Sequence, residues 1–128
     1  MASIQEPARE VAIQVEPDEL AHRLVSFAAE KNASAVTLLD IQKLTTIADY
    51  FVICTATSTV QMRAIAEGIL SEARDHIGLR GRVEGTPSDG WMALDFKDVL
   101  VHLFLPEKRE YYKLEEFWAA APAIVQMV

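Results

Sequence analysis

Three aspartates stand at the predicted ends of strands, where an α/β protein could carry out phosphoryl-transfer chemistry. Asp49 precedes one apolar segment, and Asp95 and Asp98 flank a short turn between two others. Enzymes of this kind hold magnesium between carboxylates that project together. Because Asp95 and Asp98 are three positions apart and straddle a turn, we expect them to point apart. A polar turn is the preferred interpretation, and a magnesium-dependent nucleotidyltransferase-like enzyme that uses all three aspartates is the alternative.

The remaining reactive residues do not form a recognisable site. His22, His76 and His102 fall on different predicted elements, and Cys54 has no CxxC partner, so ligand spacing for a metal is missing. His102 lies within an apolar segment and is interpreted as a core histidine with its hydrogen bonds satisfied. Cys54 lies in a predicted central strand and is interpreted as inert filler. Residues 55–58 contain no glycine that would let the backbone approach a phosphate. We predict no catalytic residues, no metal and no cofactor.

Two helices are predicted from capping residues and apolar spacing. The first begins near Pro17, followed by acids that suit the positive end of the helix dipole, and ends near Asn32. The second begins after Ser58, where the spacing to Gln61 matches a capping box, and runs to about His76. Their predicted buried faces consist of apolar residues at helical spacing: Leu20, Leu24, Phe27 and Ala28, then Ile65, Ala66, Ile69, Leu70, Ala73 and Ile77.

The strands are predicted from apolar and β-branched runs bounded by turn residues. They comprise Val36–Ile41, Tyr50–Thr55 in the middle of the sheet, a short edge strand over Gly81–Gly85, Trp91–Phe96 and Val99–Leu105. A single helical turn is expected over Thr45–Asp49. Turns are expected at Pro87–Gly90 and at the Lys97–Asp98 pair.

A last helix is expected after Pro106, with Tyr111, Leu114 and Trp118 on its docking face and Arg109 at the margin or in solvent. Helices interleaved with strands predict an α/β fold with a mixed sheet of about five strands and helices packed on it. The 128 residues suit one domain. We place this domain at 15–119, between a flexible N-terminal tail, 1–14, and a C-terminal tail, 120–128.

The charge of the chain indicates what kind of partner it prefers. Twelve Lys and Arg against nineteen Asp and Glu give a net charge of −7, and the cations are scattered. Phosphate backbones should repel such a chain, so little direct contact with nucleic acid is expected. A basic protein is a better partner, since opposite potentials steer association. No apolar run is long enough to span a membrane, and no leader sequence is evident, so we expect a cytoplasmic protein with no membrane contact.

The strand that begins at Trp91 is the best candidate for a partner surface. Alternation places Trp91 and Asp95 on one face and Met92, Leu94 and Phe96 on the other, so large apolar groups occupy both faces. One face needs a cover beyond the core, either a helix of the same chain or a partner, and Trp, Met and Phe are enriched at interfaces.

Several linked motifs resemble the Iojap-type ribosomal silencing factors. The matching residues are Ala48-Asp49-Tyr50-Phe51-Val52-Ile53-Cys54-Thr55 with Thr57-Ser58, then Glu84-Gly85, Asp89-Gly90-Trp91, Leu94-Asp95-Phe96, Asp98-Val99, Val101-His102 and Phe104, and finally Glu110-Tyr111-Tyr112, Leu114-Glu115 and Trp118. The resemblance runs in consistent order from about Leu20 to Trp118. The family's usual glycine before Thr57-Ser58 is Ala56 here, which weakens any nucleotide-binding interpretation further.

The resemblance implies a nucleotidyltransferase-like fold without catalytic residues. It implies a translational repressor that binds ribosomal protein fourteen of the large ribosomal subunit and sterically blocks joining with the small subunit, lowering translation under nutrient limitation. Carried over by position, the partner-binding residues would be Trp91, Met92, Leu94, Asp95 and Phe96. A third interpretation is a homodimer in which the aromatic strand covers its own copy, and it is compatible with the first.

Overall fold

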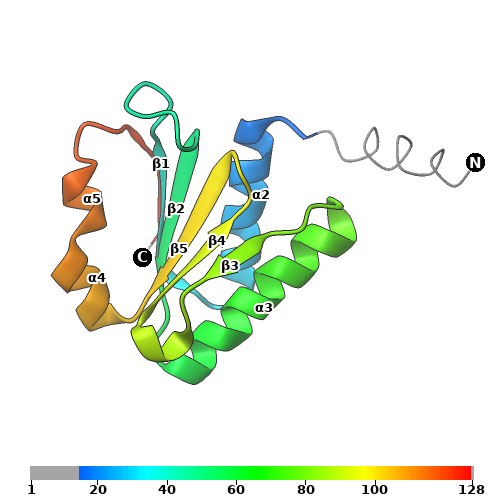
Figure 1. Ribbon diagram of the computed structural model, residues 1–128, viewed down its shortest axis with the longest axis vertical. Helices are drawn as coiled ribbons and strands as arrows, with labels where there is room; N and C mark the ends of the chain where they lie inside the picture. Colours follow the sequence, from blue (N-terminus) through cyan, green and yellow to red (C-terminus); the bar gives the residue numbers. More distant parts are fainter. Residues whose placement is uncertain (1–14, 128) are drawn as a thin grey trace, which may run out of the picture.

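A six-stranded mixed sheet with helices on both faces forms the body of the protein (Figure 1). The computed structural model describes residues 15–127, and the expected N-terminal tail at 1–14 lies outside these residues. In chain order, the elements are α2 Pro17–Glu30, β1 Ser34–Asp40, β2 Tyr50–Thr55, α3 Thr59–His76, β3 Arg82–Glu84, the 3₁₀ turn η2 Pro87–Asp89, β4 Trp91–Asp95, β5 Val99–Phe104, α4 Pro106–Tyr112, α5 Leu114–Phe117 and β6 Ala123–Gln126.

The strands lie in the order β3-β4-β5-β2-β1-β6, and β2 and β5 are the parallel pair among antiparallel neighbours. All six residues of β2 are buried, because β2 lies mid-sheet with both of its faces covered. This confirms the sequence-based prediction for Tyr50–Thr55. The two-residue turn at Lys97 and Asp98 is also confirmed, since the Phe96 amide donates to the Val99 carbonyl and closes the β4–β5 hairpin.

The larger core lies between the sheet and the helices α2 and α3, which cover one face together (Figure 1). The predicted apolar stripes of both helices face this core, with Leu70 only partly buried. Ser58 caps α3 by accepting a hydrogen bond from the Gln61 amide at 3.0 Å. The Gln61 side chain reaches back one residue further than a capping box requires, since its Oε1 accepts from the Thr57 amide at 2.6 Å.

A second, smaller core occupies the opposite face of the sheet. There α4 and α5 form a short arm, defined here as residues 106–118, that stands beside the sheet (Figure 1). The buried residues of this core are Leu39, Ile41, Ala48, Phe51, Ile53, Phe104 and Ala121, and the partly buried residues packed against them are Trp91, Leu100, Leu114 and Trp118. The sheet thus separates a face covered by long helices from a face with only partial cover.

The expected C-terminal tail was wrong in part, and with it the expected number of strands. Residues 123–126 form β6, which pairs antiparallel with β1 through Val125 opposite Leu38. The sheet therefore has six strands among the described residues rather than about five. A four-residue strand has too little pattern of its own to be recognised, because its stability comes from hydrogen bonds to a strand far away in the sequence.

The region after β1 and the last helix also differ from expectation. Residues 42–44 form a turn, whereas Thr45–Asp49 contains no helical turn. The predicted last helix is split into α4 and α5 at Lys113, whose backbone is left-handed with φ 49° and ψ 49°. The split turns Tyr111 out of the predicted docking face, and its side chain is 75% exposed.

Candidate functional site

The strand β4 alternates as predicted, and this decides which of its side chains a partner can reach. Met92, Leu94 and Phe96 are buried in the core beneath α3, at 7%, 0% and 6% exposure. These three side chains are therefore not available to a partner in this structure, which corrects their place in the predicted binding set. The covering element for this face of β4 is α3 of the same chain. Trp91 and Asp95 lie on the other face and remain partly exposed.

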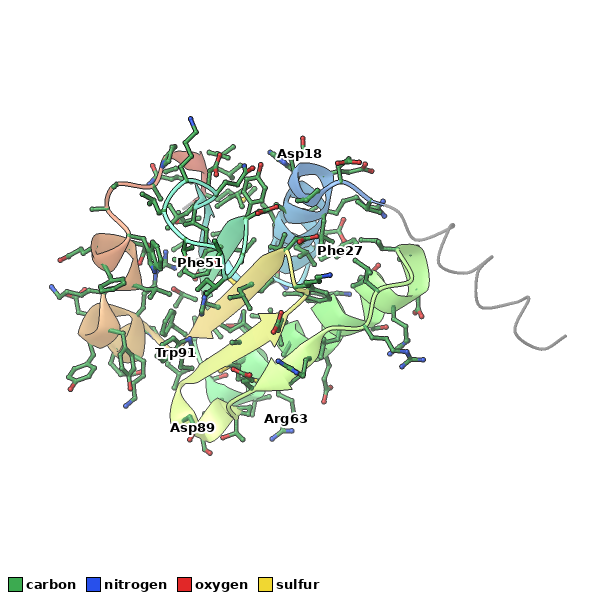
Figure 2. The ribbon with its side chains drawn as sticks, turned by 45° about the horizontal axis from the view of Figure 1, so that its top comes forward. Asp18, Phe27, Phe51, Arg63, Asp89 and Trp91 are labelled. Carbon is green, nitrogen blue, oxygen red and sulfur yellow. The ribbon has the colours of Figure 1, made fainter. Side chains whose placement is uncertain are left out.

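Trp91 lies where the open face of the sheet meets the arm (Figure 2). Its ring stacks on Phe104, with the ring centroids 4.9 Å apart, and contacts Tyr112 of α4 at 4.6 Å. Its Nε1 donates a hydrogen bond to Nδ1 of His102 at 3.2 Å. Because the polar atom of the indole is used internally, Trp91 offers a partner mainly apolar ring surface.

A groove with a volume of about 330 Å³ runs beside Trp91 on this open face. It is lined by residues of β3, β4 and β5 and by the residue that follows β3: Glu84, Gly85, Trp91, Ala93, Leu100 and His102. Most of these groups are apolar, and Glu84 is exposed and adds a negative charge at the margin. A groove of this composition suits an apolar or long basic side chain of another protein.

His102 holds Trp91 in place from the floor of this groove. Burial lowers the pKa of its imidazole to about 4, so the ring is neutral near pH 7. Since Nδ1 accepts from Trp91, the proton of the neutral ring is on Nε2. Nε2 is buried and has no hydrogen-bond partner within residues 15–127, so only one of the two ring nitrogens of the predicted core histidine is satisfied there. Its ring meets Phe51 edge to face at 4.7 Å.

The arm adds two aromatic rings that point into solvent. Tyr111 is 75% exposed and Phe117 is 78% exposed. Each is in contact with a ring that packs on the sheet, since Tyr111 meets Tyr112 at 5.1 Å and Phe117 meets Trp118 at 5.4 Å. Large exposed rings of this kind are typical of a surface that another macromolecule covers. The sequence reasoning missed Phe117, because the interruption of the helix changes which face each residue occupies.

Arg109 is a second residue whose role the sequence reasoning missed. Its side chain is 14% exposed rather than solvated, and it pairs with Glu115 across the break between α4 and α5. It also donates to the Ala35 carbonyl at 2.7 Å and to Thr55 Oγ1 at 2.8 Å, so it ties the arm to strands β1 and β2. The sequence offered only a basic pair, Lys108-Arg109, and such a pair in a helix is normally predicted to be exposed to solvent.

Of the three aspartates in the enzyme hypothesis, Asp95 has partners for its carboxylate, and Asp49 and Asp98 are joined to each other through their backbones. Asp95 Oδ1 accepts from the Lys97 amide at 2.7 Å, and its Oδ2 lies 3.4 Å from Arg82. The Asp49 amide donates to the Asp98 carbonyl at 2.8 Å, which joins the start of β2 to the hairpin. Within residues 15–127, no three His, Cys, Asp or Glu residues gather in a group that could hold a metal ion. Cys54 is fully buried, and burial raises the pKa of its thiol to about 12.

The fold and this surface define a class of protein: a small α/β protein in which long helices cover one face of the sheet, while the other face has a largely apolar groove beside Trp91 and an arm with two exposed rings. Over residues 14–127 the chain matches the family model described as "Ribosomal silencing factor during starvation". The protein therefore belongs to the ribosomal silencing factor family, as the resemblance to the Iojap-type proteins indicated.

Relatives and a solved structure agree with this placement. A ribosomal silencing factor from Halalkalibacterium halodurans is 35% identical over 106 residues, which cover 83% of this chain and 91% of that protein. A mouse protein named for mitochondrial assembly of the ribosomal large subunit is 33% identical over 99 residues, which cover 74% of this chain and 43% of that protein. A crystal structure of a Chromobacterium violaceum protein superposes with a TM-score of 0.78 at 27% identity and covers 82% of this chain and 88% of that one.

The family names describe regulation of the ribosome and not an enzymatic reaction. Within residues 15–127, no helix is both long and apolar enough to cross a membrane.

Proposed function

We propose that this protein represses translation by binding the large ribosomal subunit through its protein fourteen and sterically blocking joining with the small subunit. Repression would lower translation when nutrients are limited. Membership of a family described as silencing ribosomes during starvation supports the general role. The mouse relative is named for assembly of the large ribosomal subunit, which supports that subunit as the binding partner.

The open face of β4 together with the arm is the proposed contact surface. Trp91 and Asp95 contribute from the strand, and Tyr111 and Phe117 contribute from the arm. The observation that carries the proposal is the groove beside Trp91 on the sheet face that the long helices leave open, together with two exposed rings on the arm that packs against the same face. Burial of such rings against a partner supplies most of the affinity in protein interfaces.

The net charge of −7 supports a basic protein as the partner. Around the contact surface, Glu84 lies at the groove and Glu110 and Glu116 are exposed on the arm. Opposite charges speed association and make its rate depend on salt. The mechanism proposed here has no chemical step: the bound domain occupies the volume that the small subunit needs. It would act in the cytoplasm, with little direct contact to RNA.

A sucrose-gradient experiment tests the proposal directly. Purified large and small subunits are mixed with an excess of the protein at moderate salt, and joined ribosomes are measured against free subunits. We expect the protein to sediment with large subunits and the joined peak to shrink. Normal joining in the presence of excess protein would refute the proposed function. Sedimentation of the protein alone distinguishes a monomer from a homodimer in which the open face covers its own copy.

A pair of variants locates the contact surface. Trp91→Ala should weaken binding to large subunits by roughly 2 kcal/mol or more if Trp91 is a central anchor, which is about 30-fold in affinity. Val60→Ala is the matched control, because Val60 is 78% exposed at the start of α3 and belongs to the opposite face. Circular dichroism verifies that both variants fold. Equal affinity of a folded Trp91→Ala variant and the control would remove Trp91 from the contact surface.

A further inference from the structure

We propose that Arg109 is a positioning residue for the contact surface: its buried guanidinium fixes the bent arm so that Tyr111 and Phe117 are already in place before a partner binds. This inference rests on the proposed function and adds to it the residue that organises the surface. The Arg109 side chain itself is 14% exposed, so it acts through the arm rather than by touching the partner.

All three guanidinium nitrogens of Arg109 have partners. On the arm, Nε donates to Glu115 Oε1 at 3.2 Å, and one terminal nitrogen donates to the other oxygen of the same carboxylate. On the sheet, the other terminal nitrogen donates to the Ala35 carbonyl at 2.7 Å and to Thr55 Oγ1 at 2.8 Å. A weaker bond reaches Thr37 Oγ1 at 3.3 Å. A two-pronged contact with a carboxylate is the strongest geometry available to arginine.

An irregularity in β1 provides the acceptor for this arginine. The register of β1 against β2 shifts between Ser34 and Thr37, and Ala35 within this bulge has φ 50°. An irregular residue of this kind leaves the regular ladder of hydrogen bonds, so its carbonyl is free for another donor. Arg109 supplies that donor from the arm. The bulge in β1 and the arm are therefore joined through one side chain.

The contact with Glu115 also depends on the bend in the arm. In a straight helix, residues six positions apart are separated by about 240° around the axis and about 9 Å along it, so their side chains project to different sides. The left-handed backbone at Lys113 ends α4 and brings Glu115 back toward Arg109. The ion pair and the bend therefore support one another.

Among residues 15–127, few other side-chain contacts hold the arm. The helices α4 and α5 contain seven and four residues, and neither has a buried residue. Helices this short are not stable by themselves in water. Apart from Arg109, the arm is held by ring contacts, with Tyr112 on Trp91 at 4.6 Å and Trp118 on Phe51 at 5.4 Å, and by the partly buried Leu114, which packs against the smaller core. Without the guanidinium, a partner would have to order the arm as it binds, and that cost reduces affinity.

Hydrogen exchange of the free protein tests the first half of the inference. In Arg109→Ala, amides of residues 107–118 should exchange at least tenfold faster, whereas amides of β2 and β5 keep their protection. Arg74→Ala is the matched control, because Arg74 also pairs with a carboxylate, Asp75 at 3.3 Å, but lies on α3. Glu115→Gln keeps an oxygen acceptor and loses the charge, so it should give a smaller effect in the same amides. Unchanged exchange of the arm in both arm variants overturns the inference.

A double-mutant cycle on binding to purified large subunits tests the second half. Phe117→Ala and Arg109→Ala should each weaken binding, the latter at least tenfold. If Arg109 acts by placing the arm, Phe117→Ala should have little further effect once Arg109 is gone. Fully additive losses would overturn the positioning role. If the unaltered protein does not bind large subunits at all, the proposed function fails, while exchange in the free protein still decides whether Arg109 holds the arm.

Discussion

Protonation of His102 should make the stability of this protein depend on pH in a way that one substitution can isolate. His102 is 7% exposed, and burial lowers the pKa of its imidazole from 6.5 to about 4. In the unfolded chain the imidazole regains its ordinary pKa. Between pH 6.5 and pH 4 the unfolded state binds a proton that the folded state does not. The contribution of neutral His102 to the free energy of unfolding is therefore present above pH 6.5 and is lost as the pH falls toward 4.

The size of this effect follows from the pKa shift. Each pKa unit corresponds to about 1.4 kcal/mol, so the full loss below pH 4 is about 3 kcal/mol. Between pH 7 and pH 5, where His102 stays neutral in the folded state, the loss is about 2 kcal/mol. This is a large part of the stability of a small domain, which is commonly about 5–15 kcal/mol.

The assay compares urea unfolding of the parent protein with His102→Asn at pH 7 and pH 5. Asparagine does not titrate, and its side-chain oxygen can still accept the hydrogen bond from Trp91. The variant starts from lower stability because the volume of the ring is lost, but its stability should fall by about 2 kcal/mol less than the parent's on acidification. His76→Gln is the control, since His76 is 60% exposed beside Glu72 and should leave the His102 contribution intact. Equal pH dependence of the parent and His102→Asn would refute the reasoning.

Three further predictions concern the framework around the contact surface. The Cys54 thiol, whose pKa burial raises to about 12, should react with a thiol reagent only as fast as the protein unfolds, and rapid modification of the native protein would contradict this. Gly85→Ala should lower the free energy of unfolding by more than about 1 kcal/mol, measured in urea, because Gly85 has φ 84° and an added Cβ would lie 2.4 Å from the Trp91 carbonyl oxygen. Ser58→Ala should cost about 1 kcal/mol by removing the cap of α3, and Ser58→Asp should restore most of it; no recovery would argue against capping as the cause.

Much of the fold followed from local signals in the sequence. Apolar residues at helical spacing predicted the buried faces of α2 and α3, and the unbroken apolar run of Tyr50–Thr55 predicted a central strand. These signals were sufficient because each long element carries its own periodic pattern and its own terminating residues. The linked motifs also predicted the family correctly.

The candidate surface depended on information that no local pattern contains. Alternation along β4 divided its residues into two sets, but only the packing of α3 showed that Met92, Leu94 and Phe96 are sealed and that Trp91 faces outward. The strand β6 is stabilised by pairing with β1, which is distant in sequence. Its four residues therefore did not predict a strand by themselves.

The sequence by itself therefore determined the class of fold, the covered faces of the long helices and the identity of the family. The tertiary structure decided which sheet face is open, where the arm bends and what Arg109 does. The physical reason is the range of the interactions: helix periodicity and capping act within a few residues, whereas Arg109 joins Ala35, Thr55 and Glu115, three positions that only the folded chain brings together.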